Sequence, residues 1–223
     1  MNRSRSYPIF RWQSLKKTFK HRELYQAITF LFGLQLFPIG VTLGSMYPGY
    51  TTIITAATSL IGCTILALAL RVIIGRQRRY NYVNRVRILP ILGVFIACLI
   101  TITIMNYIYT LMGIIYPSQP NQVSLDAMFN SFPFVMIFMI TILAPVIEEL
   151  VFRELLPNAF GASYASFIAA SFIFVVIHSP SGIMGWTSYT IMAAGFLYAR
   201  LSQRSIYASI ALHIVWNTVS VVL

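Results

Sequence analysis

Long apolar stretches without a single charged residue dominate the pattern of hydrophobic and polar positions. They cover 24–70, 88–125, 127–147, 155–199 and 205–223. A helix needs about 20 apolar residues to cross a bilayer, so the first and fourth stretches are each long enough for two spans. The pattern predicts an all-α, polytopic transmembrane helical bundle of about seven spans, at 25–46, 51–71, 88–113, 129–152, 160–179, 183–200 and 205–223.

The polar start of the chain sets the predicted domain limits. Residues 1–23 are expected to form a basic cytoplasmic segment, and 24–223 a single transmembrane domain. The first apolar run is too long for the core of a signal peptide, so we interpret it as a retained span. Residues 6–20 mix aromatic side chains with Lys and Arg. An eighth helix lying at the membrane interface is therefore an alternative to a solvated tail there.

The composition also indicates a membrane protein. Of the 223 residues, 58% are hydrophobic and 9% are charged, whereas a soluble domain has about 25% charged residues. The formal net charge of +11 comes mainly from Lys and Arg in 1–22 and 71–87. Basic segments beside spans are typical of the positive-inside rule and of contact with a lipid bilayer. Because no nucleic-acid recognition module accompanies them, we exclude nucleic acid as a partner.

The connections between the predicted spans alternate between basic and uncharged. This alternation predicts a multi-pass protein of the cell membrane, with the N-terminus in the cytoplasm and the C-terminus outside. Cys63 and Cys98 each lie in the middle of an apolar span. We interpret them as small hydrophobic residues rather than as a disulfide or a metal-binding pair.

Four ionisable residues lie within the predicted spans of the second half of the chain: Glu148, Glu149, His178 and His213. Ionisable groups inside a membrane are costly and indicate function by default. Taken singly, each histidine could equally be a packing residue with its hydrogen bonds satisfied. The joint occurrence of all four in a chain with few other charges within its spans favours a functional site.

The two adjacent glutamates are expected to have different roles. Glu149 and Arg153 are four residues apart, so they share a helix face and can form a buried ion pair. Glu148 lies about 100° around the same helix and is left free to accept a proton, as a general base must. Pro145 lacks the N–H of a regular helical hydrogen bond, so a kink is expected just before these acids.

Helix arithmetic predicts that the functional residues converge. If the chain turns near 161–163, Glu148 is about 14 residues before the turn and His178 about 16 after it, so both stand at similar heights. His213 and Asn217 are four residues apart on one face of the last span. All these groups are expected to meet in the cytoplasmic half of the membrane.

In this order, three motifs resemble the CPBP family, the CAAX-protease and bacteriocin-processing (Abi) intramembrane proteases. They are Glu148-Glu149-x-x-x-Arg153, Phe174-x-x-x-His178 and His213-x-x-x-Asn217. The resemblance covers about 144–217 and implies a helical bundle with a protease-like core, which we assign to 127–223. It also implies a site inside the bilayer that opens toward the cytosol.

The same resemblance implies a role for each motif residue. Glu148 and His178 would activate a water molecule, His213 and Asn217 would stabilise the oxyanion, and Glu149 with Arg153 would hold the site in shape. Phe174 would support His178. Glu154 departs from the small residue common in the family after the motif arginine. We expect it at the membrane interface, where its loss would have little effect.

These residues are compatible with three functions, and with a site that either holds a metal ion or does not. The leading hypothesis is an intramembrane endopeptidase acting on a membrane-associated peptide or protein. One alternative is a non-catalytic partner that modulates another membrane protein, such as a sensor kinase or a cell-wall enzyme, and a weaker one is a proton-coupled transporter. Glu148, His178 and His213 resemble a His₂Glu zinc site. Without a His-Glu-x-x-His pair, we favour a water activated without a bound metal ion.

Overall fold

The computed structural model describes residues 20–80, 86–115 and 117–222, and every regular element in this part of the chain is a helix. The predicted basic segment and the alternative interfacial helix at 6–20 lie almost entirely outside the described residues. The elements are α2 (His21–Met46), η2 (Pro48–Tyr50), α3 (Thr51–Tyr80), α4 (Ile88–Leu111), α5 (Pro120–Ser131), α6 (Pro133–Phe138), η3 (Met139–Leu143), α7 (Ala144–Leu150), η4 (Val151–Leu155), α8 (Leu156–Ala159), α9 (Tyr164–Ile177), α10 (Gly182–Ser202) and α11 (Ile206–Val222).

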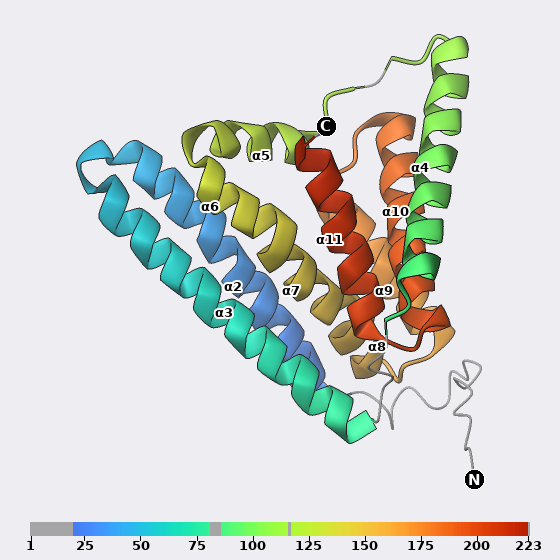
Figure 1. The fold of residues 1–223 in the computed structure, drawn as a ribbon, viewed down its shortest axis with the longest axis horizontal. Helices are drawn as coiled ribbons and strands as arrows, with labels where there is room; N and C mark the ends of the chain where they lie inside the picture. The colour runs from blue at the N-terminus through green and yellow to red at the C-terminus, as the bar shows by residue number, and fades with distance from the viewer. Residues whose placement is uncertain (1–19, 81–85, 116, 223) are drawn as a thin grey trace.

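The helices form a bundle in which α2 and α3 make one long hairpin beside the others (Figure 1). Four described helices are long and apolar enough to cross a membrane: His21–Met46, Pro48–Gln77, Ile88–Leu111 and Pro133–Ala159. Two further apolar helices, Tyr164–Ile177 and Ile206–Val221, are shorter. The all-α class and the multi-pass membrane character are confirmed, whereas the count of seven spans is not, because only four described helices meet the length and hydropathy of a span.

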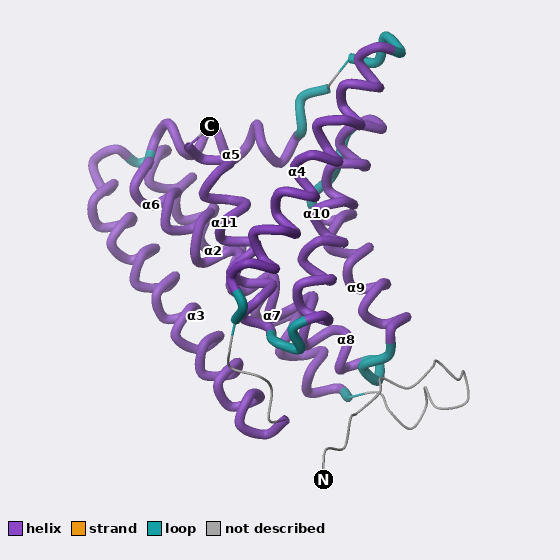
Figure 2. The backbone as a smooth tube through the Cα atoms, turned by 45° about the vertical axis from the view of Figure 1, so that its right-hand side comes forward, coloured by secondary structure: helices purple, strands orange, loops and turns teal. Residues whose placement is uncertain are grey.

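One helix was not predicted. The 12 residues of α5 follow Gln119 and lie across the end of the bundle opposite α8, as Figures 1 and 2 show. The segment is too short and too polar for a span, so its hydropathy gave no signal. Its N-terminal Pro120 and the preceding Gln119, which is 6% exposed, fix where it starts.

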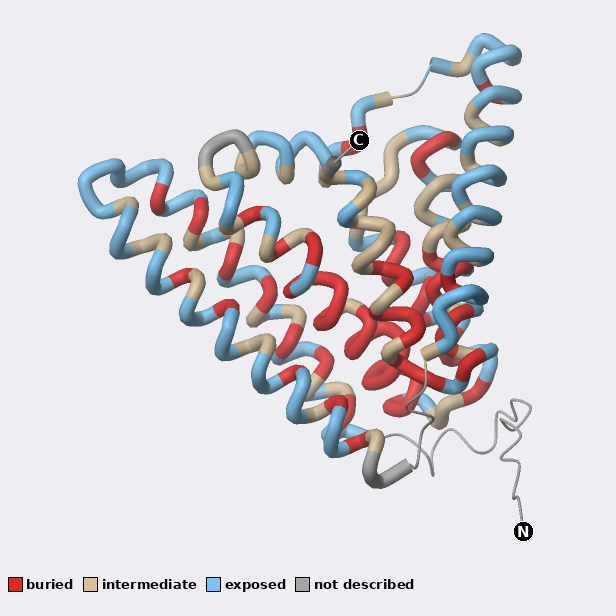
Figure 3. The backbone as a smooth tube through the Cα atoms, in the orientation of Figure 1, coloured by how far each residue is buried: buried red, intermediate tan, exposed pale blue. Residues whose placement is uncertain are grey.

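The core lies around the fourth predicted span, where nearly every residue from 143 to 159 is buried (Figure 3). Here α6, η3, α7, η4 and α8 run as one 27-residue helix, Pro133–Ala159, that contains two π turns. Each π turn precedes a proline, Pro145 or Pro157. A proline cannot donate the backbone hydrogen bond that a regular helix needs at that position, so the local disturbance expected at Pro145 takes the form of a π turn.

Close helix contacts flank this core. A Cβ atom at Gly195 of α10 would lie 2.6 Å from the Sγ atom of Cys98 on α4, so a larger residue at 195 would displace the Cys98 side chain or the helix. Cys63 and Cys98 are both free.

Glu154 is buried in a charged cluster, and the prediction that it lies at the interface is wrong. It is 1% exposed, and its carboxylate accepts hydrogen bonds from Arg76 Nε and Arg200 Nη2, each at 2.9 Å. Glu23 Oε1 is 3.6 Å from Arg76 Nη1. The physical reason is that the fourth helix does not end at 152 but continues through η4 and α8 to Ala159. Glu154 therefore faces α2, α3 and α10 inside the bundle.

Candidate active site

Two histidines from different helices face the carboxylate of Glu148. Glu148 Oε2 is 3.8 Å from His178 Nε2 and 3.7 Å from His213 Nε2. His178 caps the C-terminus of α9, and His213 lies on α11. The helix arithmetic expected Glu148 and His178 at one height, and the structure brings them together. Side chains that are 30 and 65 residues from Glu148 in the sequence thus surround one carboxylate.

Glu149 is turned away from Glu148 and is fully buried. Its Oε2 atom is 3.5 Å from Arg153 Nε, one helical turn later, as the spacing predicted. Its Oε1 atom is 3.0 Å from His213 Nδ1, a contact that the sequence did not indicate. Arg153 also lies over the ring of Phe174, 4.7 Å from its centroid. Glu149 therefore links the buried arginine to one of the two histidines.

The hydrogen bonds at Nδ1 fix which ring nitrogen of each histidine faces Glu148. His178 Nδ1 is 2.7 Å from the carbonyl oxygen of Phe174, which can only accept, so Nδ1 carries the proton. The Glu149 carboxylate likewise accepts a hydrogen bond from His213 Nδ1, which therefore also carries a proton. In a neutral ring this leaves Nε2 unprotonated. When their rings are neutral, both histidines therefore direct an acceptor nitrogen toward Glu148.

Phe174 packs between the two histidines. Its side chain is fully buried, and its ring centroid is 4.4 Å from that of His178 and 5.9 Å from that of His213. His213 also stacks on Phe196 at 4.3 Å with an angle of 19° between the rings. These aromatic contacts, together with the bonds at Nδ1, hold the rings in place. The motif phenylalanine thus supports both histidines, whereas the sequence linked it only to His178.

Asn217 bonds a backbone carbonyl that the π turn and Pro145 leave without a helical donor. In η3 the N–H of Ala144 donates to Met139, five residues back. In the same register, the partner of the Ile140 carbonyl would be residue 145, a proline without an N–H. Asn217 Nδ2 donates to this carbonyl instead, at 2.8 Å. One N–H of the Asn217 amide is therefore used to join α11 to the helix that carries Glu148.

This arrangement predicts that Asn217 and Pro145 are coupled in stability. Asn217→Leu should cost about 1–3 kcal/mol, because the Ile140 carbonyl loses its donor. In a Pro145→Ala background the new N–H of residue 145 can bond the carbonyl, so the same Asn217→Leu change should cost much less. Thermal unfolding of the four proteins in one detergent measures the difference. Equal costs of Asn217→Leu in both backgrounds would contradict the coupling.

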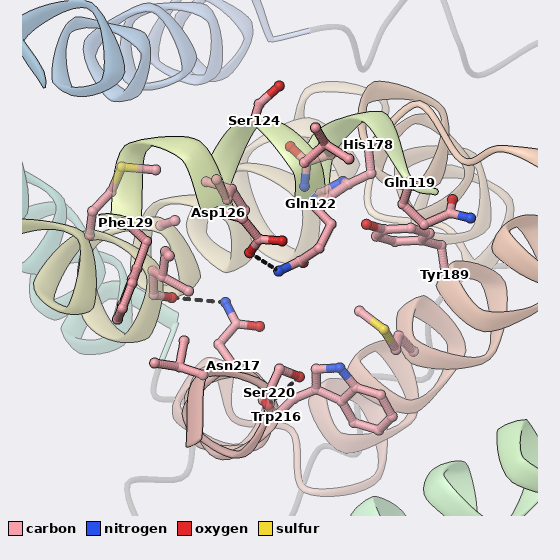
Figure 4. Close-up of a pocket in the computed structure, with 18 of the residues that line it drawn as sticks. Gln119, Gln122, Ser124, Asp126, Phe129, His178, Tyr189, Trp216, Asn217 and Ser220 are labelled. Carbon is pink, nitrogen blue, oxygen red and sulfur yellow. Dashed lines mark hydrogen bonds between the residues drawn. The ribbon is translucent and has the colours of Figure 1, made fainter. Parts of the chain in front are cut away.

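A large pocket adjoins these residues. Its cavity volume is about 800 Å³, and Glu148, His178, His213 and Asn217 all line it. Gln119, Gln122 and Asp126 line it from the start of α5 and from α5 itself, and Figure 4 shows Gln122 hydrogen-bonded to Asp126 beside the cavity. The sequence analysis missed these α5 residues. These residues belong to a polar segment between two predicted spans, and the sequence of such a segment does not indicate whether it lines a pocket or forms a loop.

Gln119 fixes the turn that follows His178. Its Oε1 atom accepts from the N–H of Ser181 at 2.8 Å, and its Nε2 atom donates to the carbonyl of the same residue at 3.2 Å. The side-chain amide thus pairs with the peptide groups of Ser181 as another backbone strand would. This contact ties the start of α5 to the connection between α9 and α10, so one wall of the pocket is built onto the helix end that carries His178.

The residues suited to a metal do not form a metal-binding group. Among residues 20–80, 86–115 and 117–222, no three His, Cys, Asp or Glu side chains are arranged to hold an ion. Glu148, His178 and His213, the donors that a His₂Glu site would use, are not such a group in the described structure. We therefore derive no step through a metal. Water activation without an ion stays a prediction, which the metal content of active, purified protein would test.

Comparison with known proteins finds a similarity in the motif-bearing part of the chain. Residues 130–219 match the model of the type II CAAX prenyl endopeptidase Rce1-like family. The resemblance to the CPBP family is confirmed. The matched segment contains all three motifs and the whole carboxylate–histidine arrangement, whereas α2, α3 and α4 lie outside it.

One curated relative is similar over part of its length. The chain is 26% identical over 109 residues to UPF0177 protein YvdC of Lactococcus lactis subsp. lactis (strain IL1403). The similarity covers 48% of this chain and 42% of that protein, so the chain spans less than half the length of the relative it matches. No solved structure matches the chain significantly.

Proposed function

We propose that this protein is an intramembrane endopeptidase that hydrolyses a peptide bond of a membrane-associated peptide or protein. The observation that carries the proposal is the carboxylate of Glu148 facing two histidine Nε2 atoms, at 3.8 and 3.7 Å, beside a cavity of about 800 Å³. These residues lie in the segment that matches a peptidase family. A base, a positioned water and donors to an oxyanion are the requirements for amide hydrolysis.

In the proposed reaction, Glu148 takes a proton from a water molecule held between its carboxylate and His178 Nε2. The water oxygen attacks the peptide carbonyl, and a tetrahedral intermediate with a negatively charged oxygen forms. Glu148 then gives the proton to the leaving amine as the C–N bond breaks. The Phe174 carbonyl keeps the His178 ring in the orientation that this step needs.

His213 and Asn217 are the proposed donors to the oxyanion. In the proposed step both ring nitrogens of His213 carry a proton, so that Nδ1 donates to the Glu149 carboxylate, 3.0 Å away, and Nε2 donates to the oxyanion. Asn217 has already donated one N–H to Ile140, so its second N–H is the one that remains for the oxyanion. Arg153 balances the charge of Glu149 and has a supporting role.

We also infer that the protein lies in the cell membrane with its N-terminus in the cytoplasm. The described arginines near helix ends support this orientation. Arg76 and Arg200 meet at Glu154, and the Arg87 backbone pairs with the Gln203 side chain at the end of α10. These residues therefore mark one basic end of the bundle, and the positive-inside rule assigns that end to the cytoplasm.

Hydrolysis in oxygen-18 water tests the proposed function. The purified protein, reconstituted into membranes from cells that lack it, should release new peptide C-termini, each with one oxygen-18 atom in its new carboxylate. The label is expected because the attacking oxygen comes from water. Mass spectrometry of the products, with ordinary water as the control, makes the measurement. No new peptide ends, or new C-termini that never carry the label, would contradict a hydrolytic function and leave the non-catalytic alternative.

A further inference from the structure

The pocket extends from the candidate active site toward one end of the bundle only. Beyond Glu148, His178 and His213, it is lined by Asn106 near the end of α4 and Ser220 near the end of α11. α5 lies across the same end, and Figures 1 and 2 show it at the end of the bundle opposite α8. The cavity therefore connects the carboxylate–histidine arrangement with the α5 end.

The basic end of the bundle does not contribute to the pocket. Arg71, Arg76, Arg87, Arg200 and Arg204 are not among its lining residues, and none of the described residues that line it is Lys or Arg. Glu154 and its partner arginines fill the bundle at the basic end instead, with Glu154 1% exposed and Arg200 fully buried. A substrate thus has no route to Glu148 past this cluster in the described structure.

The charge of the pocket wall restricts the substrate further. Two carboxylates, Glu148 and Asp126, line the cavity, together with the amides of Gln119, Gln122 and Asn217. A free C-terminal carboxylate, such as that of a cytosolic CAAX tail, is normally bound by Arg or Lys. The described wall offers neither, and its own carboxylates would repel an acidic segment.

We propose that the pocket opens on the non-cytoplasmic side of the membrane and takes a neutral or basic stretch of a membrane-anchored peptide or protein from that side. This inference rests on the proposed function and on the orientation inferred from the arginines. It differs from the cytosolic opening that the family resemblance implies. The substrate class is an anchored polypeptide whose scissile bond lies in its outer part, rather than a cytosolic C-terminal tail.

Two matched cysteine variants test the side on which the pocket opens. Ser124 on α5 and Ser202 at the end of α10 are both exposed, and Ser124 lines the pocket. Ser124→Cys and Ser202→Cys are each made in a chain that carries Cys63→Ala and Cys98→Ala. A membrane-impermeant maleimide added to intact cells should label residue 124 and should reach residue 202 only after permeabilisation. Any other labelling pattern overturns the proposal.

The same reagent tests whether the labelled end is the entry route. In intact cells with Ser124→Cys, a bulky maleimide should abolish the formation of peptide ends that depend on Glu148. The same treatment of cells with Ser202→Cys should leave these ends unchanged. If cleavage continues after complete labelling of residue 124, the substrate does not enter there and the proposal fails. If cells whose protein carries the original Ser124 form no peptide ends that depend on Glu148, the proposed function fails, whatever the labelling pattern.

Discussion

Glu148→Gln should nearly abolish proteolysis while the protein remains folded. General-base assistance is typically worth about 10²–10⁴ in rate, and glutamine keeps the shape of the side chain but cannot take the proton. Glu148 is not bonded within the usual hydrogen-bond distance to either histidine, since the two contacts measure 3.7 and 3.8 Å. The folded yield in detergent should therefore equal that of the unmodified protein, and product formation by mass spectrometry measures the loss.

Glu149→Gln is the matched control for this result. Its carboxylate lies 3.5 Å from Arg153 Nε and 3.0 Å from His213 Nδ1, with no exposure to solvent. Its loss leaves a buried arginine short of a negative charge, so yield and thermal stability should fall together with activity. Equal activity of the Glu148→Gln variant and the unmodified protein would remove Glu148 from the mechanism. A folding defect in Glu148→Gln as large as that in Glu149→Gln would make its role structural.

Glu154→Gln should strongly destabilise the protein. The change removes the negative charge that Arg76 and Arg200 share at 2.9 Å inside the bundle. Breaking a buried ion pair by neutralising one partner costs about 3–5 kcal/mol. The thermal unfolding midpoint and the yield of folded protein in one detergent measure this loss.

Asp126→Asn is the matched control for Glu154→Gln. It is also a carboxylate-to-amide change, but on an exposed residue of α5, where substitutions usually alter stability by less than about 0.5 kcal/mol. If Glu154→Gln unfolds at the same temperature as Asp126→Asn, the charged cluster does not stabilise the bundle.

The sequence predicted two contacts of the candidate site. Helix periodicity makes this possible, because it relates residues that are near in sequence or linked by a short turn. The Glu149–Arg153 contact follows from a spacing of four, and the meeting of Glu148 with His178 follows from equal distances to one hairpin turn. Burial of ionisable side chains in a membrane is costly, so the few that occur within predicted spans were identified as candidate functional residues. The same reasoning identified the segment that matches the Rce1-like family.

The features that were missed depend on contacts that no local pattern contains. Glu154 was expected at the interface because the fourth span was placed at 129–152, yet the helix continues through η4 and α8 to Ala159. The Asn217–Ile140 bond depends on the register of a π turn, which hydropathy does not indicate. α5 is short and polar, so it resembled a connection. Each of these features is visible only when the neighbouring helices are in place.

A comparison of peptide ends in cells tests the central claim most directly. Cells with the unmodified protein and cells with Glu148→Gln, at equal amounts of folded protein in the membrane, are analysed for new ends of membrane-associated peptides and proteins. We predict a set of ends that occurs with the unmodified protein and is lost with Glu148→Gln. Identical sets of ends in the two kinds of cell would contradict the assignment of this protein as a Glu148-dependent protease.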